Sequence, residues 1–205
     1  MMTKTLWQPR WFSFDASSSP ASPCWPVQIV ASAHLDQAGS LDYAVVKGPV
    51  CPLLVAWKPT AIVLAQLLCH QSVGDVLADW QDRYPSQHWS AKSHLPFAVE
   101  ALLNGGEVRD IIPLAMDGTV FQQSVWTTLL RVPSGQVVSY ADLAAASGFP
   151  RGSRAVGSAM AANPIPALVP CHRVIRSDGQ PGNYGSGTDV KVHMLQWESS
   201  HFCDK

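Results

Sequence analysis

Hydrophobic residues in the first half of the chain fall into short runs separated by turn-forming residues. Runs at 27–31, 41–46 and 50–57 are rich in Val, Ile, Leu and Ala and carry few charges, which is typical of β-strands. Ala-Gly-Ser at 38–40 separates the first two runs, and Pro52 interrupts the third. The first 26 residues, rich in Trp, Ser and Pro, predict an irregular arm.

Helical spacing follows these strands. A helix is expected over about 60–70, with Thr60 as its N-cap and apolar residues at 62, 63, 64, 67 and 68. A second is expected over 73–83, where Val73, Val76, Leu77 and Trp80 form one stripe, and a third over 94–103. Strands followed by helices indicate an α+β unit.

The second half of the chain is predicted to be mostly helical. Breakers between 111 and 118 indicate a linker, and Thr119 is a plausible N-cap for a helix that ends near Val132. Ser139 is expected to cap a helix over 140–146, and a further helix is expected over about 153–162. Two short helices joined by a Gly-containing turn are the helix-turn-helix arrangement.

Composition places the chain among globular proteins. Its 205 residues are 47% hydrophobic and 14% charged, enough apolar material for a core. No apolar run approaches the roughly 18 residues of a membrane span, and the amino terminus shows no signal-peptide pattern. We therefore expect no membrane association and a cytoplasmic location.

Five widely spaced cysteines, at 24, 51, 69, 171 and 203, form no Cys-x-x-Cys pair. This spacing predicts neither a metal site nor a disulfide framework. An odd number of cysteines with one reactive thiol fits a reducing cytosol.

Net charge is −1, but the positive charge is concentrated in one region. Residues 121–176 hold five arginines against the single acid Asp142. Because phosphate contacts require a local basic face, this region is a candidate nucleic-acid surface. The expected helix at 153–162 has almost only small side chains after Arg154, which suits close approach to a minor groove or to another helix.

The chemistry is expected at Cys171, which lies between Pro170 and His172. Both Pro166 and Pro170 stiffen the approach to the sulfur. His172 and Arg173 favour the thiolate, which is the nucleophilic form of cysteine. A buried structural cysteine is the alternative interpretation of this pair taken alone.

Pro-Cys-His-Arg-Val at 170–174 resembles the acceptor-cysteine motif of the O6-alkylguanine-DNA alkyltransferases. The resemblance runs in order through 118–126, 135–140, 154–157 and Asn163-Pro164 to Glu198, about 80 residues; the first half of the chain is similar only loosely. It implies an α+β fold: a small ribonuclease-H-like α/β amino-terminal domain (1–112), a linker (113–118) and a mostly helical helix-turn-helix domain (119–205).

The resemblance also implies a role for each residue in the motifs. Cys171 receives the alkyl group, His172 takes the thiol proton through a water, and Glu198 orients His172. Tyr140 donates a proton to guanine, and Asn163 orders the turn before the cysteine.

Other residues of the motifs are expected at the DNA and around the flipped base. The arginine matching Arg154 inserts into the base stack in place of the flipped nucleotide. Expected DNA contacts are Arg154, Ser139, Tyr140, Ala155, Gly157 and Ser177, and expected pocket residues are Met160, Val174, Tyr184 and Gly185. Gly185-Ser186-Gly187 departs from the adjacent glycines usual in the family.

The expected function is direct-reversal DNA repair: a single-turnover methylated-DNA–protein-cysteine methyltransferase, without cofactor or metal, that acts as a monomer on double-stranded DNA containing O6-alkylguanine. Activity on O4-alkylthymine and cooperative binding on DNA stay open, and no chemistry is assigned to residues 1–110. The alternatives are a non-catalytic alkyltransferase-like binder, a cysteine hydrolase and a helix-turn-helix transcription factor. The binder lacks the acceptor cysteine, the hydrolase normally takes its histidine from far along the chain, and the transcription factor requires long side chains for major-groove reading.

Overall fold

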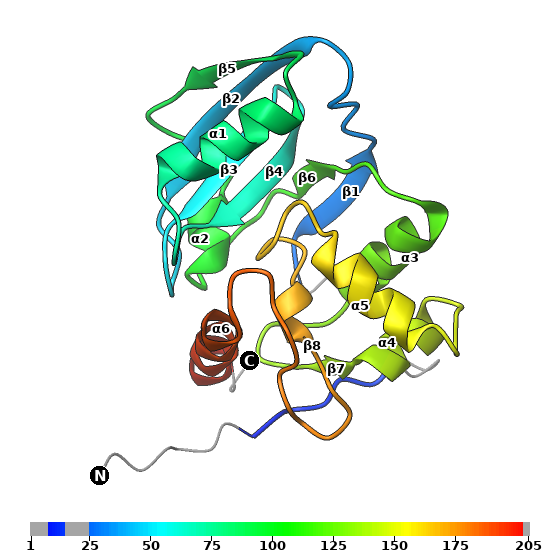
Figure 1. Cartoon of the computed structure of the whole chain (residues 1–205). Helices are drawn as coiled ribbons and strands as arrows, with labels where there is room; N and C mark the ends of the chain where they lie inside the picture. The colour runs from blue at the N-terminus through cyan, green and yellow to red at the C-terminus, as the bar shows by residue number, and fades with distance from the viewer. Residues whose placement is uncertain (1–7, 15–24, 203–205) are drawn as a thin grey trace.

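The described part of the chain, residues 8–14 and 25–202 of this computed structural model, forms a mixed α/β structure (Figure 1). One part is a six-stranded sheet with two helices, and the other contains four helices and a two-stranded sheet. Of the arm expected over residues 1–26, only 8–14 and the last two residues lie within the described ranges.

The large sheet has the order β1-β6-β4-β3-β2-β5. Strands β2, β3 and β4 form an antiparallel meander, whereas β1 and β4 pair with β6 in parallel and β5 pairs with β2 in parallel. The bounds are β1 Val27–Ala31, β2 Gly39–Val46, β3 Leu53–Lys58, β4 Ala61–Leu67, β5 Gln87–Ala91 and β6 Ile112–Ala115.

Strand β4 corrects the prediction of a helix over 60–70. It lies between β6 and β3 and is buried on both faces, so five consecutive residues, Ala-Ile-Val-Leu-Ala, are all buried. A continuous apolar run contains helical spacings as well as strand spacings, and periodicity does not distinguish the two. The prediction of a linker at 113–118 is also wrong in part, because its first residues belong to β6.

The other expectations for the first half are largely confirmed. Strands occur at β1, β2 and β3, although β3 begins only after Pro52. Helix α1 (Val73–Arg83) begins with a capping box between Ser72 and Asp75 and buries Val76 and Trp80. Of the helix expected over 94–103, only α2 (Val99–Leu103) forms.

The second half follows its predicted pattern closely. Thr119 caps α3 (Val120–Leu129) through a capping box with Gln122, and Ser139 caps α4 (Tyr140–Ala146). Helices α4 and α5 (Ser153–Ala161) form the helix-turn-helix pair. The remaining elements are β7 Val138–Ser139, a 3₁₀ turn Cys171–Arg173, β8 Val174–Ile175, which pairs with β7, and α6 Thr188–His201.

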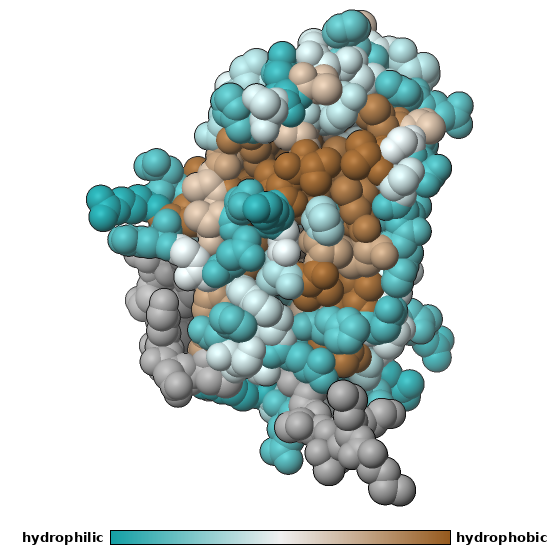
Figure 2. All heavy atoms as spheres, turned by 90° about the vertical axis from the view of Figure 1, so that its left-hand side faces the viewer, coloured by the Kyte–Doolittle hydropathy of each residue, from teal (hydrophilic) through white to brown (hydrophobic). Residues whose placement is uncertain are grey.

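The two parts of the described chain share one hydrophobic core. Buried residues of the sheet and of α3–α6 belong to the same cluster, and the backbone N–H of Ala65 in β4 donates to the carbonyl of Pro164, 2.9 Å away. A second cluster lies under α1. Figure 2 shows hydrophobic residues gathered over the middle of one face of the molecule. Among the described residues, no helix combines the length and apolar character needed to cross a membrane.

A disulfide joins Cys51 and Cys69, and the expectation that no disulfide would form is therefore wrong. The two cysteines lie 18 residues apart, on either side of the β3–β4 hairpin, and the backbone N–H of Leu68 donates to the carbonyl of Pro52 beside them. Spacing along the chain could not reveal this pair because the antiparallel hairpin itself brings its two ends together.

We expect this disulfide to stabilise the fold by constraining the unfolded chain. For a closed loop of this length, the free energy of unfolding should fall by about 3 kcal/mol when Cys51 and Cys69 are both changed to Ser. Urea denaturation of the double variant, with and without a reductant, checks this. Reductant should lower the stability of the wild type but not that of the variant; equal stability of the two proteins under oxidising conditions would contradict it.

Candidate active site

The segment before Cys171 is held by the side chain of Asn163. Its Oδ1 accepts from the N–H of Ile165 at 3.0 Å, and its Nδ2 donates to the carbonyl of Val169 at 2.9 Å and to the sulfur of Cys171 at 3.2 Å. One side-chain amide therefore orders the turn and also contacts the thiol, because an asparagine side chain can form hydrogen bonds with nearby backbone groups. Ala167, with φ of +72°, adopts the left-handed conformation within the same turn.

Cys171 begins the 3₁₀ turn at the wall of the main cavity. It is 4% exposed and is the free cysteine of the described residues. The cavity has a volume of about 790 Å³, large enough for a purine. Its wall comes from α4, α5, the turn before Cys171 and the loop before α6, and includes Tyr140, Arg154, Gly157, Met160, Asn163, Arg176, Tyr184 and Gly185.

The sulfur is in an environment that favours the thiol. Burial raises the pKa of Cys171, while the hydrogen bond from Asn163 and the charge of Lys191 act in the opposite direction without cancelling the effect. At neutral pH the resting residue is therefore protonated. A nucleophilic thiolate requires that another group accept the proton.

His172 is the nearest candidate for this acceptor along the chain. Its ring is buried, and Nε2 lies 2.9 Å from Oε1 of Glu198. Burial lowers the pKa of His172, and the Glu198 carboxylate partly offsets this effect. The other ring nitrogen, Nδ1, is buried and has no hydrogen-bond partner among the described residues. One nitrogen is thus anchored and the other is available for a proton.

Glu198 is buried rather than solvated, since it is 5% exposed at the last turns of α6. Besides His172, it accepts hydrogen bonds from the guanidinium of Arg173, at 2.8–3.1 Å, and from the N–H of Gly135, at 3.1 Å. Burial alone would raise the pKa of Glu198, but Arg173 and His172 together hold that pKa well below its usual range. Glu198 is therefore ionised at all physiological pH values.

Arg173 differs most from the sequence interpretation, which counted it among the cations facing DNA and beside the thiol. Its side chain is fully buried, with the guanidinium carbon 4.3 Å from the ring centroid of Trp25. It also donates to the carbonyl of Val132 and to Oγ of Ser134, each at 2.8 Å. Arg173 is thus the partner of Glu198, and the exposed arginines of this region are Arg131, Arg151, Arg154 and Arg176.

A protein of Methanosarcina barkeri named methylated-DNA–protein-cysteine methyltransferase is 34% identical over 159 residues, which cover 78% of this chain and 98% of that protein. The chain belongs to the methylated-DNA–protein-cysteine methyltransferase family. The family model described as 6-O-methylguanine DNA methyltransferase, DNA binding domain, matches residues 120–200.

Solved structures of this methyltransferase family have the same fold. The crystal structure of the O6-methylguanine methyltransferase of Mycobacterium tuberculosis superimposes with a TM-score of 0.65 at 30% identity, covering 80% of this chain and 96% of that one. A second structure from that organism, in complex with DNA, has a TM-score of 0.63 at 31% identity, covering 79% and 94%. The likeness therefore includes the sheet as well as the motif-bearing half.

Among the predicted site residues of this family member, some line the cavity or are exposed, and two are buried away from it. Tyr140, Arg154, Gly157, Met160, Tyr184 and Gly185 line the cavity, and Ala155 and Ser177 are exposed. Val174, predicted in the pocket, is fully buried and does not line it, because its strand β8 turns the side chain into the core. Ser139, predicted at the DNA, is 3% exposed because its hydroxyl is engaged with Asp142 as the cap of α4.

Lys191 is a site residue to which the sequence interpretation gave no role. It is 1% exposed, its Nζ donates to the carbonyl of Val174 at 2.6 Å, and it lies 5.8 Å from the ring centroids of both Tyr140 and Tyr184. Burial lowers the pKa of Lys191 to about 8. It therefore places a positive charge behind the cavity, close enough to Cys171 to favour the thiolate.

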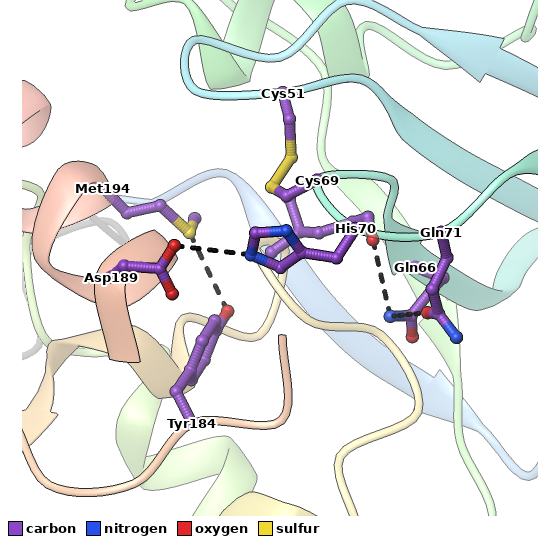
Figure 3. The surroundings of a disulfide bond; sticks show 9 residues. Cys51, Gln66, Cys69, His70, Gln71, Tyr184, Asp189 and Met194 are labelled. Atoms are coloured by element: carbon purple, nitrogen blue, oxygen red, sulfur yellow. Dashed lines mark hydrogen bonds and ion pairs between the residues drawn. A yellow bond between two sulfur atoms is a disulfide. The ribbon is translucent and has the colours of Figure 1, made fainter. Parts of the chain in front are cut away.

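The loop of residues 181–187, before α6, closes one side of the cavity. Gly182 has a φ of +70°, and a Cβ there would lie 3.2 Å from the hydroxyl of Tyr140, so this position requires glycine. Figure 3 shows the contacts around this loop: His70, next to the disulfide, lies 3.4 Å from Asp189 of α6, and the hydroxyl of Tyr184 points to the sulfur of Met194.

The first half of the chain also reaches the cavity, which no sequence signal indicated. Gln66 of β4 is a cavity-lining residue, and its amide donates to Gln71 at 3.2 Å (Figure 3). Trp25, just before β1, contacts Arg173. Both contacts depend on how the sheet packs against the turn at Pro164, and this packing has no local pattern in the sequence.

Glu198→Gln should destabilise the protein in a pH-dependent way. The pKa of Glu198 is depressed in the fold, so its contribution to stability is present above the unfolded value near 4.5 and is lost as pH falls below it. At pH 7 the variant leaves Arg173 without its carboxylate, and the free energy of unfolding should fall by about 3–5 kcal/mol. Denaturant unfolding at several pH values between 7 and 3 measures this difference.

The matched control is Glu107→Gln, at an exposed carboxylate paired with the exposed Arg109. The control should stay within about 0.5 kcal/mol of the wild type at every pH. A Glu198→Gln effect of constant size across the pH range would contradict the assignment of Glu198 as a depressed, ionised partner.

Proposed function

We propose that this chain repairs DNA by transferring a methyl group from O6 of guanine to the sulfur of Cys171, in one irreversible turnover. Membership of the methylated-DNA–protein-cysteine methyltransferase family supports this activity. The observation that carries the proposal is Cys171 itself. It opens on a cavity of purine size, next in the chain to a histidine whose far nitrogen is anchored on a buried carboxylate.

In the proposed reaction His172 accepts the proton of Cys171 at Nδ1, through a bridging water, and Glu198 stabilises the resulting imidazolium. The thiolate attacks the methyl carbon, so the S–C bond forms as the bond from carbon to O6 breaks. Tyr140 donates its hydroxyl proton to the departing guanine and recovers a proton from solvent, and the His172 imidazolium releases to solvent the proton that it took from Cys171. The net change is thiol plus O6-methylguanine to thioether plus guanine.

The electrostatics of Tyr140 suit a proton donor. Burial first, and the neighbouring Cys171 second, raise the pKa of this hydroxyl above its usual value. It therefore keeps its proton at neutral pH until negative charge develops on the leaving base, which is when a general acid is needed.

The thioether product explains why the turnover is single. Among the described residues there is no second free cysteine beside Cys171 that could attack the methyl group. Because an S-alkyl cysteine does not hydrolyse under cellular conditions, each protein molecule is consumed by one lesion.

We propose that α5 enters the minor groove of double-stranded DNA and that a monomer is sufficient for the reaction. The outer face of α5 presents Arg154, Ala155 and Ser158, while Val156 and Ala159 face the core. Such a face gives close approach without sequence reading. Arg154 would occupy the gap left when the damaged nucleotide turns into the cavity that this residue borders.

We also propose that the chain divides into a ribonuclease-H-like domain, residues 1–112, and a DNA-binding domain, residues 119–205. We propose a cytoplasmic location for the protein, because bacterial and archaeal DNA resides in the cytoplasm. The disulfide is unusual for a reducing compartment. Trapping thiols in intact cells, followed by mass analysis of the peptides that carry Cys51 and Cys69, determines its state there.

Incubation with DNA containing O6-methylguanine should add the mass of one CH₂ unit to the intact protein, and peptide mapping should place it on Cys171. Cys171→Ser should show no gain, because it lacks the acceptor sulfur. The DNA product should be unmodified guanine. Release of free methanol with an unmodified protein, or continued turnover beyond one equivalent, would overturn the proposal.

Arg154→Ala should slow methyl transfer by about 10-fold or more at saturating DNA, because the flipped nucleotide loses the side chain that replaces it. Fluorescence of 2-aminopurine opposite the lesion reports the unstacking directly and should decrease in this variant. Arg151→Ala, a control two residues before α5, should weaken DNA binding in a salt-dependent way and leave the saturated rate unchanged. Equal effects of the two substitutions would argue against insertion by Arg154.

A further inference from the structure

Trp25 connects the first half of the chain to the catalytic network. It lies just before β1 and is 4% exposed, and its indole Nε1 donates to the carbonyl of Leu168 at 2.8 Å. Leu168 belongs to the segment that leads into Cys171. The ring of the same tryptophan lies against the guanidinium of Arg173, 4.3 Å from ring centroid to Cζ. One side chain thus touches both the approach to the sulfur and the cation behind Glu198.

The edges of the Arg173 guanidinium are occupied by hydrogen bonds. Nε donates to both carboxylate oxygens of Glu198, Nη1 donates to Val132, and Nη2 donates to Ser134 and again to Glu198. The flat faces of the group remain, and Trp25 covers one of them. Hydrogen bonds fix the position of the guanidinium in its plane, and the indole face limits its movement out of that plane.

The orientation of Arg173 affects His172 because both residues contact the carboxylate of Glu198. Oε1 of Glu198 accepts from Nη2 and Nε of Arg173 and lies 2.9 Å from Nε2 of His172. A tilt of the guanidinium would draw this oxygen with it and lengthen the contact to His172. Trp25 has no place in the wall of the main cavity, so it does not meet the substrate.

We propose that Trp25 is a positioning residue for the transfer reaction: its indole face holds Arg173, and through it Glu198, in the arrangement that keeps His172 ready to accept the proton of Cys171. The proposal rests on the function proposed above. The aromatic face of Trp25 also has an electrostatic effect that favours proton transfer to His172. When His172 becomes an imidazolium, the buried cluster of His172, Arg173 and Lys191 carries three positive charges, and the negative face of the indole stabilises the one on Arg173.

The test compares Trp25→Leu, Trp25→Phe and Trp80→Leu. Trp80 is the matched control, because it is also 4% exposed but lies in the separate cluster under α1. For each protein we would measure the rate of Cys171 methylation at saturating O6-methylguanine DNA, the dissociation constant for DNA, and the free energy of unfolding.

Trp25→Leu should reduce the saturated rate by about tenfold or more, the factor expected from losing a desolvated cation–π contact, with the DNA dissociation constant within about twofold of the wild type. Trp25→Phe keeps an aromatic face and should recover most of the rate, although it lacks the N–H that bonds to Leu168. Trp80→Leu should lose comparable stability and keep the wild-type rate.

A further readout does not depend on DNA. Alkylation of Cys171 by iodoacetamide, followed on its own peptide as a function of pH, should be slower near neutral pH in Trp25→Leu than in the wild type and close to the wild type in Trp25→Phe. A Trp25→Leu protein with the wild-type saturated rate, or a Trp80→Leu protein with the same loss of rate, overturns the positioning role. If the wild type itself takes up no methyl group, the proposed function fails, and the iodoacetamide profiles still test the effect of Trp25 on the sulfur.

Discussion

One buried carboxylate, that of Glu198, holds the site together. It is shared between a permanent cation, Arg173, and the imidazole of His172, which becomes cationic in the reaction we propose. The arginine keeps the carboxylate ionised in an apolar interior, and the ionised carboxylate gives His172 a fixed orientation and a place to store charge. Helix α6, the 3₁₀ turn and the turn at Gly135 all converge on this single group, so the position of Cys171 depends on electrostatics as much as on packing.

The sheet contributes more than support to this arrangement. Its strand β4 bonds to the turn at Pro164 and supplies Gln66 to the cavity wall, and Trp25 lies on the buried arginine. Next to the disulfide, His70 of this half contacts Asp189 of α6 (Figure 3). The half of the chain with the weaker resemblance thus borders the reactive half at several points.

Local chemistry was predictable, and contacts between distant segments were not. Helix caps at Thr119 and Ser139 and the motif around Cys171 are defined by residues a few positions apart, so the sequence alone indicated them. The burial of Arg173 was not predictable, because an arginine beside a reactive cysteine gives no sign of a tryptophan some 150 residues earlier. Strand β4 was mistaken for a helix, and Cys51–Cys69 was missed, since both depend on neighbours in the sheet rather than on neighbours in the chain.

The resting state of the sulfur has a consequence for a protein that is used up by its own reaction. Peroxides and small electrophiles react with thiolates far faster than with thiols, and Cys171 is buried and held as a thiol. We therefore expect a molecule waiting for a rare lesion to keep its acceptor sulfur intact among the reactive compounds that cause such lesions. The same burial thus shields the sulfur until a base enters the cavity.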